Sequence, residues 1–122
     1  MSTQQLAEAF MGQYYAQFNS NRANLRGLYG PDSMLTLTGT PVQGADSIVA
    51  QFNSLPPCQA KPITFNVQEN PVTHGAIILV NGDLTLTANG AKAKFVETFF
   101  VDPVSGAAGQ YYIHNHVYRI QQ

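Results

Sequence analysis

Large apolar side chains recur every fourth residue near the start of the chain, and this stripe constrains the fold more than any other feature. The stripe consists of Leu6, Phe10, Tyr14 and Phe18. Its spacing predicts an amphipathic helix that is capped by Ser2 or Thr3 and ends near Asn19. A helix with such a wide apolar face needs another layer of structure to cover that face.

Two shorter helices are expected on either side of the first strand. Ser20 or Asn21 can cap a short second helix, and Arg22 is expected to tie loop backbone together or to stay in solvent. The third helix is expected from about Asp46, its predicted cap, to Leu55, where two prolines follow and stop it. The predicted order is therefore helix, helix, strand, helix.

Alternation of apolar and polar residues predicts five strands. They cover residues 34–40, 63–67, 76–87, 94–102 and 110–121. Hairpin-type turns are expected between the last four, one of them over residues 103–109, and Gly82 predicts a bend or bulge. Twist accumulates along such strands, so we expect a cone-shaped, curved antiparallel sheet wrapped around the first helix. This is an α+β fold in a single domain over residues 1–122.

Charged residues are scarce, which limits the partners that the chain can bind. They make up 11% of the 122 residues and give a formal net charge of -1. The six basic residues are scattered in sequence, so we expect no nucleic-acid partner and no anionic membrane surface. Cys58 is the single cysteine, expected to be an inert thiol, and no signal peptide or membrane-spanning run is recognisable. These features favour a reducing compartment, cytosolic or nuclear.

The strand over residues 94–102 has apolar side chains on both faces, since Phe95 and Phe99 alternate with Val96 and Phe100. A sheet face open to water is seldom so apolar, so we expect a second copy of the chain to cover it. The residues expected at this dimer interface are Phe95, Phe99, His114 and His116. Helix and loop packing within one chain is the alternative.

Three titratable side chains suggest catalysis inside the cone. His114 and His116 are two residues apart on one strand, which places both on one face unless a bulge intervenes. A metal site would need a third ligand, and Asp83 lacks a positioned partner for acid-base chemistry. We therefore expect structural roles for all three, no metal or other cofactor, and no enzymatic activity. Arg119, if buried, is expected to pair with Glu97.

Three segments carry a family likeness. They are FMGQYYAQFNSNRANLRGLYGPDSMLT at residues 10–36, VQGADSIVAQFNSLP at residues 42–56 and HNHVYRI at residues 114–120. Together they resemble the nuclear transport factor 2 family over essentially the whole chain. The resemblance implies a non-enzymatic homodimeric carrier that binds the GTPase Ran in its GDP form and FxFG nucleoporin repeats. It also implies a protein of the cytoplasm, the nucleus and the nuclear pore, which brings Ran into the nucleus.

The resemblance further assigns residues to sites. An apolar cavity that receives an aromatic side chain of Ran in the family has these matching positions here: Leu37, Leu55, Pro57, Leu84, Leu86 and Tyr118. The acidic residues around that cavity in the family correspond here to the uncharged Thr38, Thr87 and Asn89. The nucleoporin site corresponds to Thr3, with Leu6 as the nearest apolar residue. Ran recognition is therefore expected to be weaker than in the family, or to meet a partner surface that has changed with it.

Two functions of other classes fit the same fold. One is a related adaptor domain for RNA export or for other protein partners. The other is a small-molecule lyase or isomerase that uses Asp83 or the histidines inside the cone. Binding of Ran in its GDP form would favour the carrier, and a polar, occupied cavity would favour the enzyme.

Overall fold

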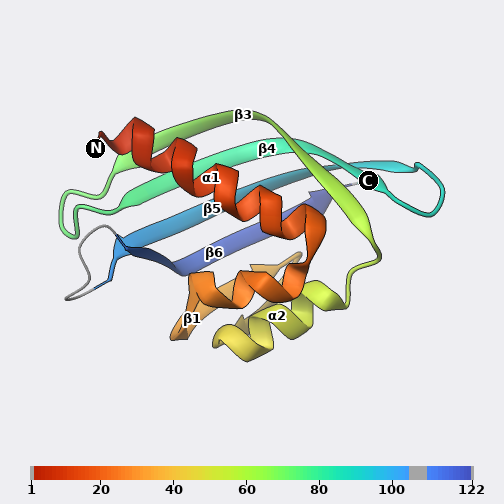
Figure 1. Cartoon of the computed structure of the whole chain (residues 1–122), viewed down its shortest axis with the longest axis horizontal. Helices are drawn as coiled ribbons and strands as arrows, with labels where there is room; N and C mark the ends of the chain where they lie inside the picture. The colour runs from red at the N-terminus through yellow and green to blue at the C-terminus, as the bar shows by residue number, and fades with distance from the viewer. Residues whose placement is uncertain (1, 105–109, 122) are drawn as a thin grey trace.

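A long helix lies across a curved six-stranded sheet (Figure 1). The computed structural model describes residues 2–104 and 110–121. The elements are α1 (Thr3–Ser20), the 3-10 helix η1 (Arg22–Leu28), β1 (Tyr29–Leu37), β2 (Thr40–Gln43), α2 (Ala45–Asn53), β3 (Cys58–Glu69), β4 (Ala76–Leu86), β5 (Lys92–Pro103) and β6 (Tyr111–Gln121). All three helices lie on one side of the sheet, which confirms the predicted α+β cone. Within the described residues, no helix is both long and apolar enough to cross a membrane.

Capping residues set where the helices begin. At Ser2 the hydroxyl accepts a hydrogen bond from the Gln5 amide, and the Gln5 side chain accepts one from the Ser2 amide. This capping box satisfies two amides that the helix itself leaves unpaired, as the sequence predicts for Ser2. Asn21 caps η1, and its side-chain oxygen accepts a hydrogen bond from the Ala23 amide. In α2 the N-cap is Gly44 rather than Asp46, which lies in the first turn, where its charge favours the helix dipole.

The six strands form one sheet in the order β2-β1-β6-β5-β4-β3. The predicted antiparallel succession of the last four strands is confirmed. The structure differs from the prediction in the first strand, which ends at Leu37, turns through Thr38 and Gly39, both with positive φ, and returns as β2. It also places β1 parallel to β6. The turn predicted over residues 103–109 falls largely on 105–109, outside the described residues.

A bulge in β3 lies opposite Gly82. The register between β3 and β4 shifts between Pro62 and Thr64, next to the pair formed by Pro62 and Gly82. A Cβ atom at Gly82 would lie 2.2 Å from the carbonyl oxygen of Lys61, so a side chain there would collide with backbone. Glycine therefore permits the close approach of the two strands at the bulge.

A second bulge decides the orientation of the histidines in β6. Phe100 pairs with Asn115, but its neighbour Val101 pairs with Ile113, which leaves His114 as the extra residue. As a result His116 points into the core, whereas His114 lies on the other face beside Phe100. The prediction that the two histidines share a face is wrong, because the bulge breaks the alternation between them.

Aromatic side chains fill the interior of the cone. Tyr14 and Phe99 pack edge to face with ring centroids 4.8 Å apart, and Phe18 packs in the same way against Phe52 at 6.0 Å. All four are buried. Burial of each such side chain contributes roughly 2 to 3 kcal/mol to stability. The centre of the cone is therefore a packed core.

Candidate functional site

An open pocket of about 410 Å³ lies where the ends of α1 and α2 meet the start of β3. We name it the mouth pocket. Its walls are formed by Phe18, Asn19, Ser20, Asn21, Arg22, Asn53, Leu55, Pro57, Cys58, Gln59 and Thr87. Apolar side chains and a ring of amides and hydroxyls make up most of this wall, and Arg22 is its one charged member.

Arg22 holds the segment that joins α2 to β3. Its Nη1 donates to the carbonyl oxygens of Phe52 and Leu55 at 2.7 and 2.9 Å, and its Nη2 donates to that of Pro56 at 2.7 Å. The guanidinium carbon also lies 5.4 Å from the centroid of the Phe18 ring, a cation-π distance. The last carbonyls of a helix lack partners within the helix, so one arginine satisfies them and fixes the loop. The expectation that Arg22 ties loop backbone together is confirmed.

Cys58 lies beside this arginine and is buried. The Sγ atom is 3.8 Å from Nη2 of Arg22. Burial raises the pKa of the Cys58 thiol, and the positive charge of Arg22 partly opposes that rise. A thiol held in its protonated form is a poor nucleophile, in agreement with an inert role.

The residues assigned to the apolar cavity occupy two depths. Leu55 and Pro57 line the mouth pocket, together with Thr87, whose amide donates to the Pro57 carbonyl oxygen at 3.0 Å. Leu37, Leu84 and Tyr118 are buried in the core, and Leu86 is half-buried against it. Leu55 and Pro57 therefore lie together at an opening, whereas Leu37, Leu84 and Tyr118 are part of the packed interior.

The other two rim positions lie in turns. Thr38, in the turn between β1 and β2, is exposed, and its hydroxyl accepts a hydrogen bond from the Ile120 amide at 3.1 Å. Asn89 lies in the turn between β4 and β5, where its side-chain oxygen accepts from the Ala91 amide at 2.9 Å. The Thr38 hydroxyl thus ties its turn to β6, the Asn89 side chain stabilises its own turn, and neither supplies charge to the rim.

Tyr118 is 1% exposed and carries an orphaned hydroxyl. Its ring packs against Phe18 and Phe95, with centroids 6.3 and 5.7 Å away. Among the described residues no group hydrogen-bonds the hydroxyl oxygen. Burial, followed by the charge of Glu97, raises the pKa of Tyr118 well above its ordinary value, so the group remains a proton donor without an acceptor. An unpaired buried hydroxyl costs about 1 to 3 kcal/mol.

The substitution Tyr118→Phe is therefore expected to raise the free energy of unfolding by about 1 kcal/mol, because it removes an unpaired polar group and keeps the ring. Urea unfolding followed by circular dichroism measures the difference. A loss of stability of similar size would contradict the expectation and would show that an internal water satisfies the hydroxyl.

A buried polar network occupies the centre of the cone. Glu97 accepts hydrogen bonds from the hydroxyls of Tyr15 at 2.5 Å and Tyr14 at 3.3 Å. Its Oε1 also lies 2.6 Å from Nε2 of His116, whose Nδ1 lies 2.8 Å from the Tyr29 hydroxyl. The side chains of Glu97 and His116 are both 0% exposed. Each polar side chain of the network thus has a partner within it, as burial requires.

The expected pair between Arg119 and Glu97 does not form. Arg119 lies opposite Val96, one residue before Glu97, and successive strand residues point to opposite faces. Arg119 is consequently exposed on the outer face, and Glu97 points inward to His116. The error arises because the sequence does not reveal the register between β5 and β6.

The central network has the character of a structural element. Burial and, second, the charge of Glu97 raise the pKa of Tyr14, Tyr15 and Tyr29, so the three hydroxyls remain protonated. The side chains of Glu97 and His116 have no exposed surface that a substrate could reach. Among the described residues, no three side chains of histidine, cysteine, aspartate or glutamate are arranged to hold a metal ion. Asp83, the other candidate base, pairs on the outer face with Lys94 at 3.3 Å.

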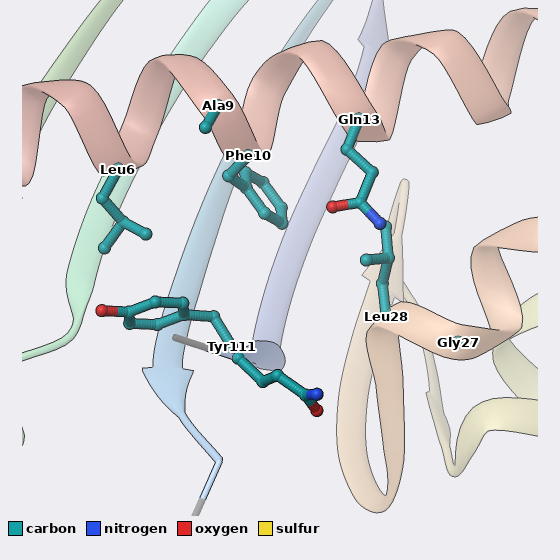
Figure 2. A pocket seen from close by; sticks show the side chains of 8 residues that line it. Leu6, Ala9, Phe10, Gln13, Gly27, Leu28 and Tyr111 are labelled. Carbon is teal, nitrogen blue, oxygen red and sulfur yellow. The ribbon is translucent and has the colours of Figure 1, made fainter. Parts of the chain in front are cut away.

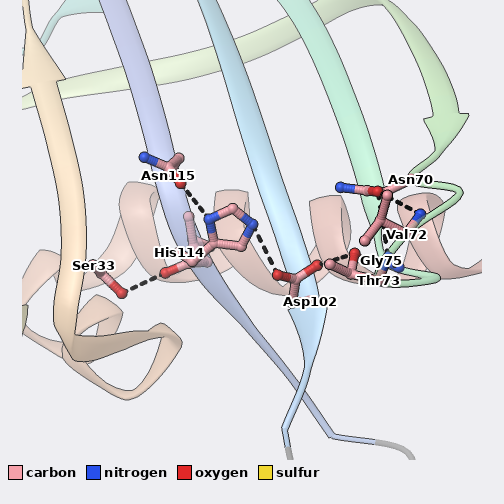
Figure 3. Close-up of polar contacts among 9 residues, drawn as sticks. Ser33, Asn70, Val72, Thr73, Gly75, Asp102, His114 and Asn115 are labelled. Atoms are coloured by element: carbon pink, nitrogen blue, oxygen red, sulfur yellow. Dashed lines mark hydrogen bonds and ion pairs between the residues drawn. The ribbon is translucent and has the colours of Figure 1, made fainter.

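The residues expected at a dimer interface divide between the two faces. Phe95, Phe99 and His116 are buried on the inner face, so an interface on the outer face cannot include them. Their neighbours in sequence, Val96 and Phe100, face outward instead. His114 does lie on the outer side, where its Nε2 is 2.9 Å from Oδ2 of Asp102 (Figure 3). The Thr73 hydroxyl donates to Oδ1 of the same carboxylate at 2.6 Å, which links β5 and β6 to the connection after β3.

A second cavity, the α1 groove, lies between α1, the end of η1 and the start of β6 (Figure 2). Its volume is about 440 Å³. Its walls are formed by Leu6, Ala9, Phe10, Gln13, Gly27, Leu28, Gln110 and Tyr111. Leu6 therefore faces a groove, whereas Thr3, on the first turn of α1, is not one of its lining residues.

Comparison with known proteins identifies the family. The Nuclear transport factor 2 (NTF2) domain matches residues 6–120. Nuclear transport factor 2B of Arabidopsis thaliana is 34% identical over 122 residues, which cover 98% of this chain and 95% of that protein. The chain belongs to the nuclear transport factor 2 family. Family and fold together support the role of a nuclear transport factor, and the relatives are named as transport factors rather than as enzymes.

Two solved structures share the fold. Nuclear transport factor 2 from Cryptosporidium parvum is 37% identical with a TM-score of 0.88, covering 98% of this chain and 94% of that one. A chain of the C. albicans Mtr2-Mex67 M domain complex has a TM-score of 0.85 over the same shares, at 17% identity. The second likeness concerns the fold alone.

Proposed function

We propose that the protein is a non-enzymatic homodimeric carrier that binds Ran in its GDP form and FxFG nucleoporin repeats. It would move between cytoplasm and nucleus through the nuclear pore. The observation that carries this proposal is the mouth pocket, an open pocket with a mainly polar wall that includes Leu55 and Pro57, two positions that the family resemblance assigns to the cavity for an aromatic side chain of Ran. Family membership over nearly the whole chain supports it.

The mouth pocket suits a single apolar anchor. Leu55 and Pro57 present apolar surface at the opening, and the Arg22 hydrogen bonds keep the loop between α2 and β3 in place. A site held in its binding conformation loses less entropy on association. An aromatic side chain that enters such a pocket is the kind of contact that dominates binding energy.

The uncharged rim defines the expected strength of that interaction. Thr38, Thr87 and Asn89 cannot form the charge-assisted bonds that acidic residues would offer to a basic partner, each worth about 1.5 to 3 kcal/mol. We therefore propose a Ran complex that depends on the apolar anchor and responds weakly to salt.

Immobilised Ran, loaded with GDP or with GTP, provides the test. The GDP form is expected to bind at least about tenfold more tightly. Leu55→Ala is expected to weaken binding by roughly thirtyfold, as for truncation of a central anchor. Val72→Ala is the matched control, since Val72 is 84% exposed in the connection between β3 and β4, away from the pocket. Equal binding of the two nucleotide forms would refute the carrier proposal.

The α1 groove is the proposed site for the phenylalanines of FxFG repeats. Leu6, Phe10 and Tyr111 give it apolar walls, and the amide of Gln13 lies at its edge (Figure 2). Titration with an FxFG peptide is expected to shift the NMR signals of Leu6 and Tyr111 first. Shifts confined to the outer face of the sheet would exclude the groove.

The outer face of the sheet is the proposed dimer interface. Ile63, Leu79 and Val117 are 54%, 46% and 55% exposed there, which leaves apolar surface uncovered in the single chain. Light scattering is expected to give twice the chain mass of 13.3 kDa, and Val117→Glu is expected to return the mass to 13.3 kDa without loss of fold. A wild-type mass of 13.3 kDa at micromolar concentration would contradict the dimer.

The uncharged rim also favours a second candidate, an adaptor with another protein partner. Mtr2, which shares the fold, is solved in a complex with Mex67. Failure to bind either form of Ran, together with stable association through the outer face with a different chain, would favour this alternative.

A further inference from the structure

Four of the six basic residues meet at one end of the outer face of the sheet, although three separate parts of the sequence contribute them. Lys61 lies on β3, Lys92 and Lys94 lie on β5, and Arg119 lies on β6. All four are exposed in the single chain. They lie toward one end of the strands, beyond the residues of the proposed dimer interface, Ile63, Leu79 and Val117. We name this cluster, together with Asp83 between its members, the basic end.

Strand register brings the three lysines together. Asp83 pairs directly with Lys61 on one side and with Lys94 on the other. Direct partners on neighbouring strands project to the same face, and so do residues two apart on a strand. Lys92, two residues before Lys94 and opposite Thr85, therefore shares this face.

Arg119 completes the cluster from the adjoining strand. Its partner across β5 and β6 is Val96, two residues after Lys94. The four cations thus span three strand spacings, a width of about 14 Å. Among the described residues, Asp83 is the one carboxylate within ion-pair distance of any of them, at 3.3 Å from the Lys94 Nζ.

The fold separates charges of opposite sign. The basic end has a formal side-chain charge of +3, from four cations and Asp83, whereas all other side chains total −4, from six carboxylates and two arginines. Glu69 and Asp102 lie at the opposite ends of β3 and β5. The surface therefore has a positive end although the net charge of the whole chain is -1.

We propose that the basic end binds a short acidic segment, rich in aspartate and glutamate, of a protein partner. Four or five extended residues span about 14 to 17 Å and match the width of the cluster. The separated charges also orient such a segment on approach. This surface is distinct from the mouth pocket, so the proposal goes beyond binding of Ran and does not depend on it.

The surroundings favour a short acidic peptide over a nucleic acid. Proteins that bind single strands stack bases on exposed aromatic rings, and the ring of Phe95, the residue after Lys94, is buried on the inner face. A longer polyanion that ran along the strands would also meet the negative charge of Glu69 and Asp102 at their far end. A segment of a few acidic residues avoids both problems.

Fluorescence anisotropy with a fluorescein-labelled hexaglutamate peptide tests the proposal on the intact protein. Four exposed ion pairs, each worth at most about 1 kcal/mol, predict a dissociation constant of roughly 1 mM at low salt. The substitutions Lys61→Gln, Lys92→Gln and Arg119→Gln are each expected to weaken binding about two- to fivefold, and the triple variant at least about tenfold. Raising the salt concentration from about 50 to 200 mM is expected to weaken binding of the peptide to the wild-type protein as well.

Arg26→Gln is the matched control, because it removes the same charge from an exposed arginine that pairs with Asp46 on α2. An equal loss in this control would overturn the proposal, since overall charge alone would then explain the binding. Tighter binding of a labelled oligouridylate, lost in the same variants, would also overturn it in favour of a nucleic acid. Absence of saturable peptide binding would do the same. Light scattering on each variant shows whether the proposed outer-face dimer is retained. A variant that keeps the wild-type mass has therefore not lost peptide binding through loss of that dimer.

Discussion

Glu97→Ala is expected to lower the free energy of unfolding by about 3 to 5 kcal/mol. The carboxylate has no exposed surface and accepts hydrogen bonds from Tyr14 and Tyr15, while its Oε1 lies 2.6 Å from His116. Its removal leaves two hydroxyls and an imidazole nitrogen without a partner in the core. Each of these groups was desolvated on folding, so the loss exceeds that of a surface ion pair.

Urea unfolding of the wild type and three variants measures this effect. Glu97→Gln retains an oxygen acceptor and is expected to lose only about 1 to 2 kcal/mol. Glu69→Ala removes a carboxylate that is exposed at the end of β3 and is expected to change stability by less than about 0.5 kcal/mol. If Glu97→Ala fell within the range of Glu69→Ala, the central network would not contribute to the native state.

Arg22→Ala is expected to cost about 2 to 4 kcal/mol and to loosen the mouth pocket. The guanidinium donates to three carbonyl oxygens at the end of α2 and in the loop that follows. Water can replace it at the exposed Pro56 carbonyl, whereas the partly buried carbonyls of Phe52 and Leu55 lose a charged donor. The same change removes the cation-π contact with Phe18.

Two measurements separate the effect on the loop from the effect on global stability. Urea unfolding gives the total loss, and hydrogen exchange is expected to accelerate at the amides of Ser54 and Leu55, which donate to carbonyls of α2. Arg22→Lys keeps the charge but lacks the planar fork, so a partial recovery is expected. Arg26→Ala, an exposed arginine with a single ion pair, is expected to stay within about 0.5 kcal/mol. Unchanged hydrogen exchange at these two amides in Arg22→Ala would show that Arg22 does not hold the loop in place.

Much of the fold follows from patterns of neighbouring residues. The recurrence of large apolar residues at every fourth position from Leu6 to Phe18 places α1 correctly, and the Ser2 cap lies where the sequence indicates. The run of long alternating segments likewise predicts the strands from β3 to β6. These features depend on side chains within a few residues of one another, and local backbone geometry alone relates them.

The candidate sites depended more strongly on register. The family resemblance named Leu55, Pro57 and Thr87, and these three line the mouth pocket. Wrong expectations arose wherever one residue of register mattered, as for His114 and for the partner of Glu97. A shift of one residue moves a strand side chain to the other face, and the bulge at His114, unlike the one opposite Gly82, is not recognisable from the sequence.

The sequence by itself determined the family, the helices and the apolar interior, because these follow from periodicity and from a likeness along nearly the whole chain. The folded chain was needed to show which carbonyls Arg22 holds at the mouth pocket, that Glu97 meets His116, and that cations from three strands form the basic end. The physical reason is that each arrangement joins residues from separate elements. Strand pairing and bulges, which no short stretch of sequence encodes, set the distances between them.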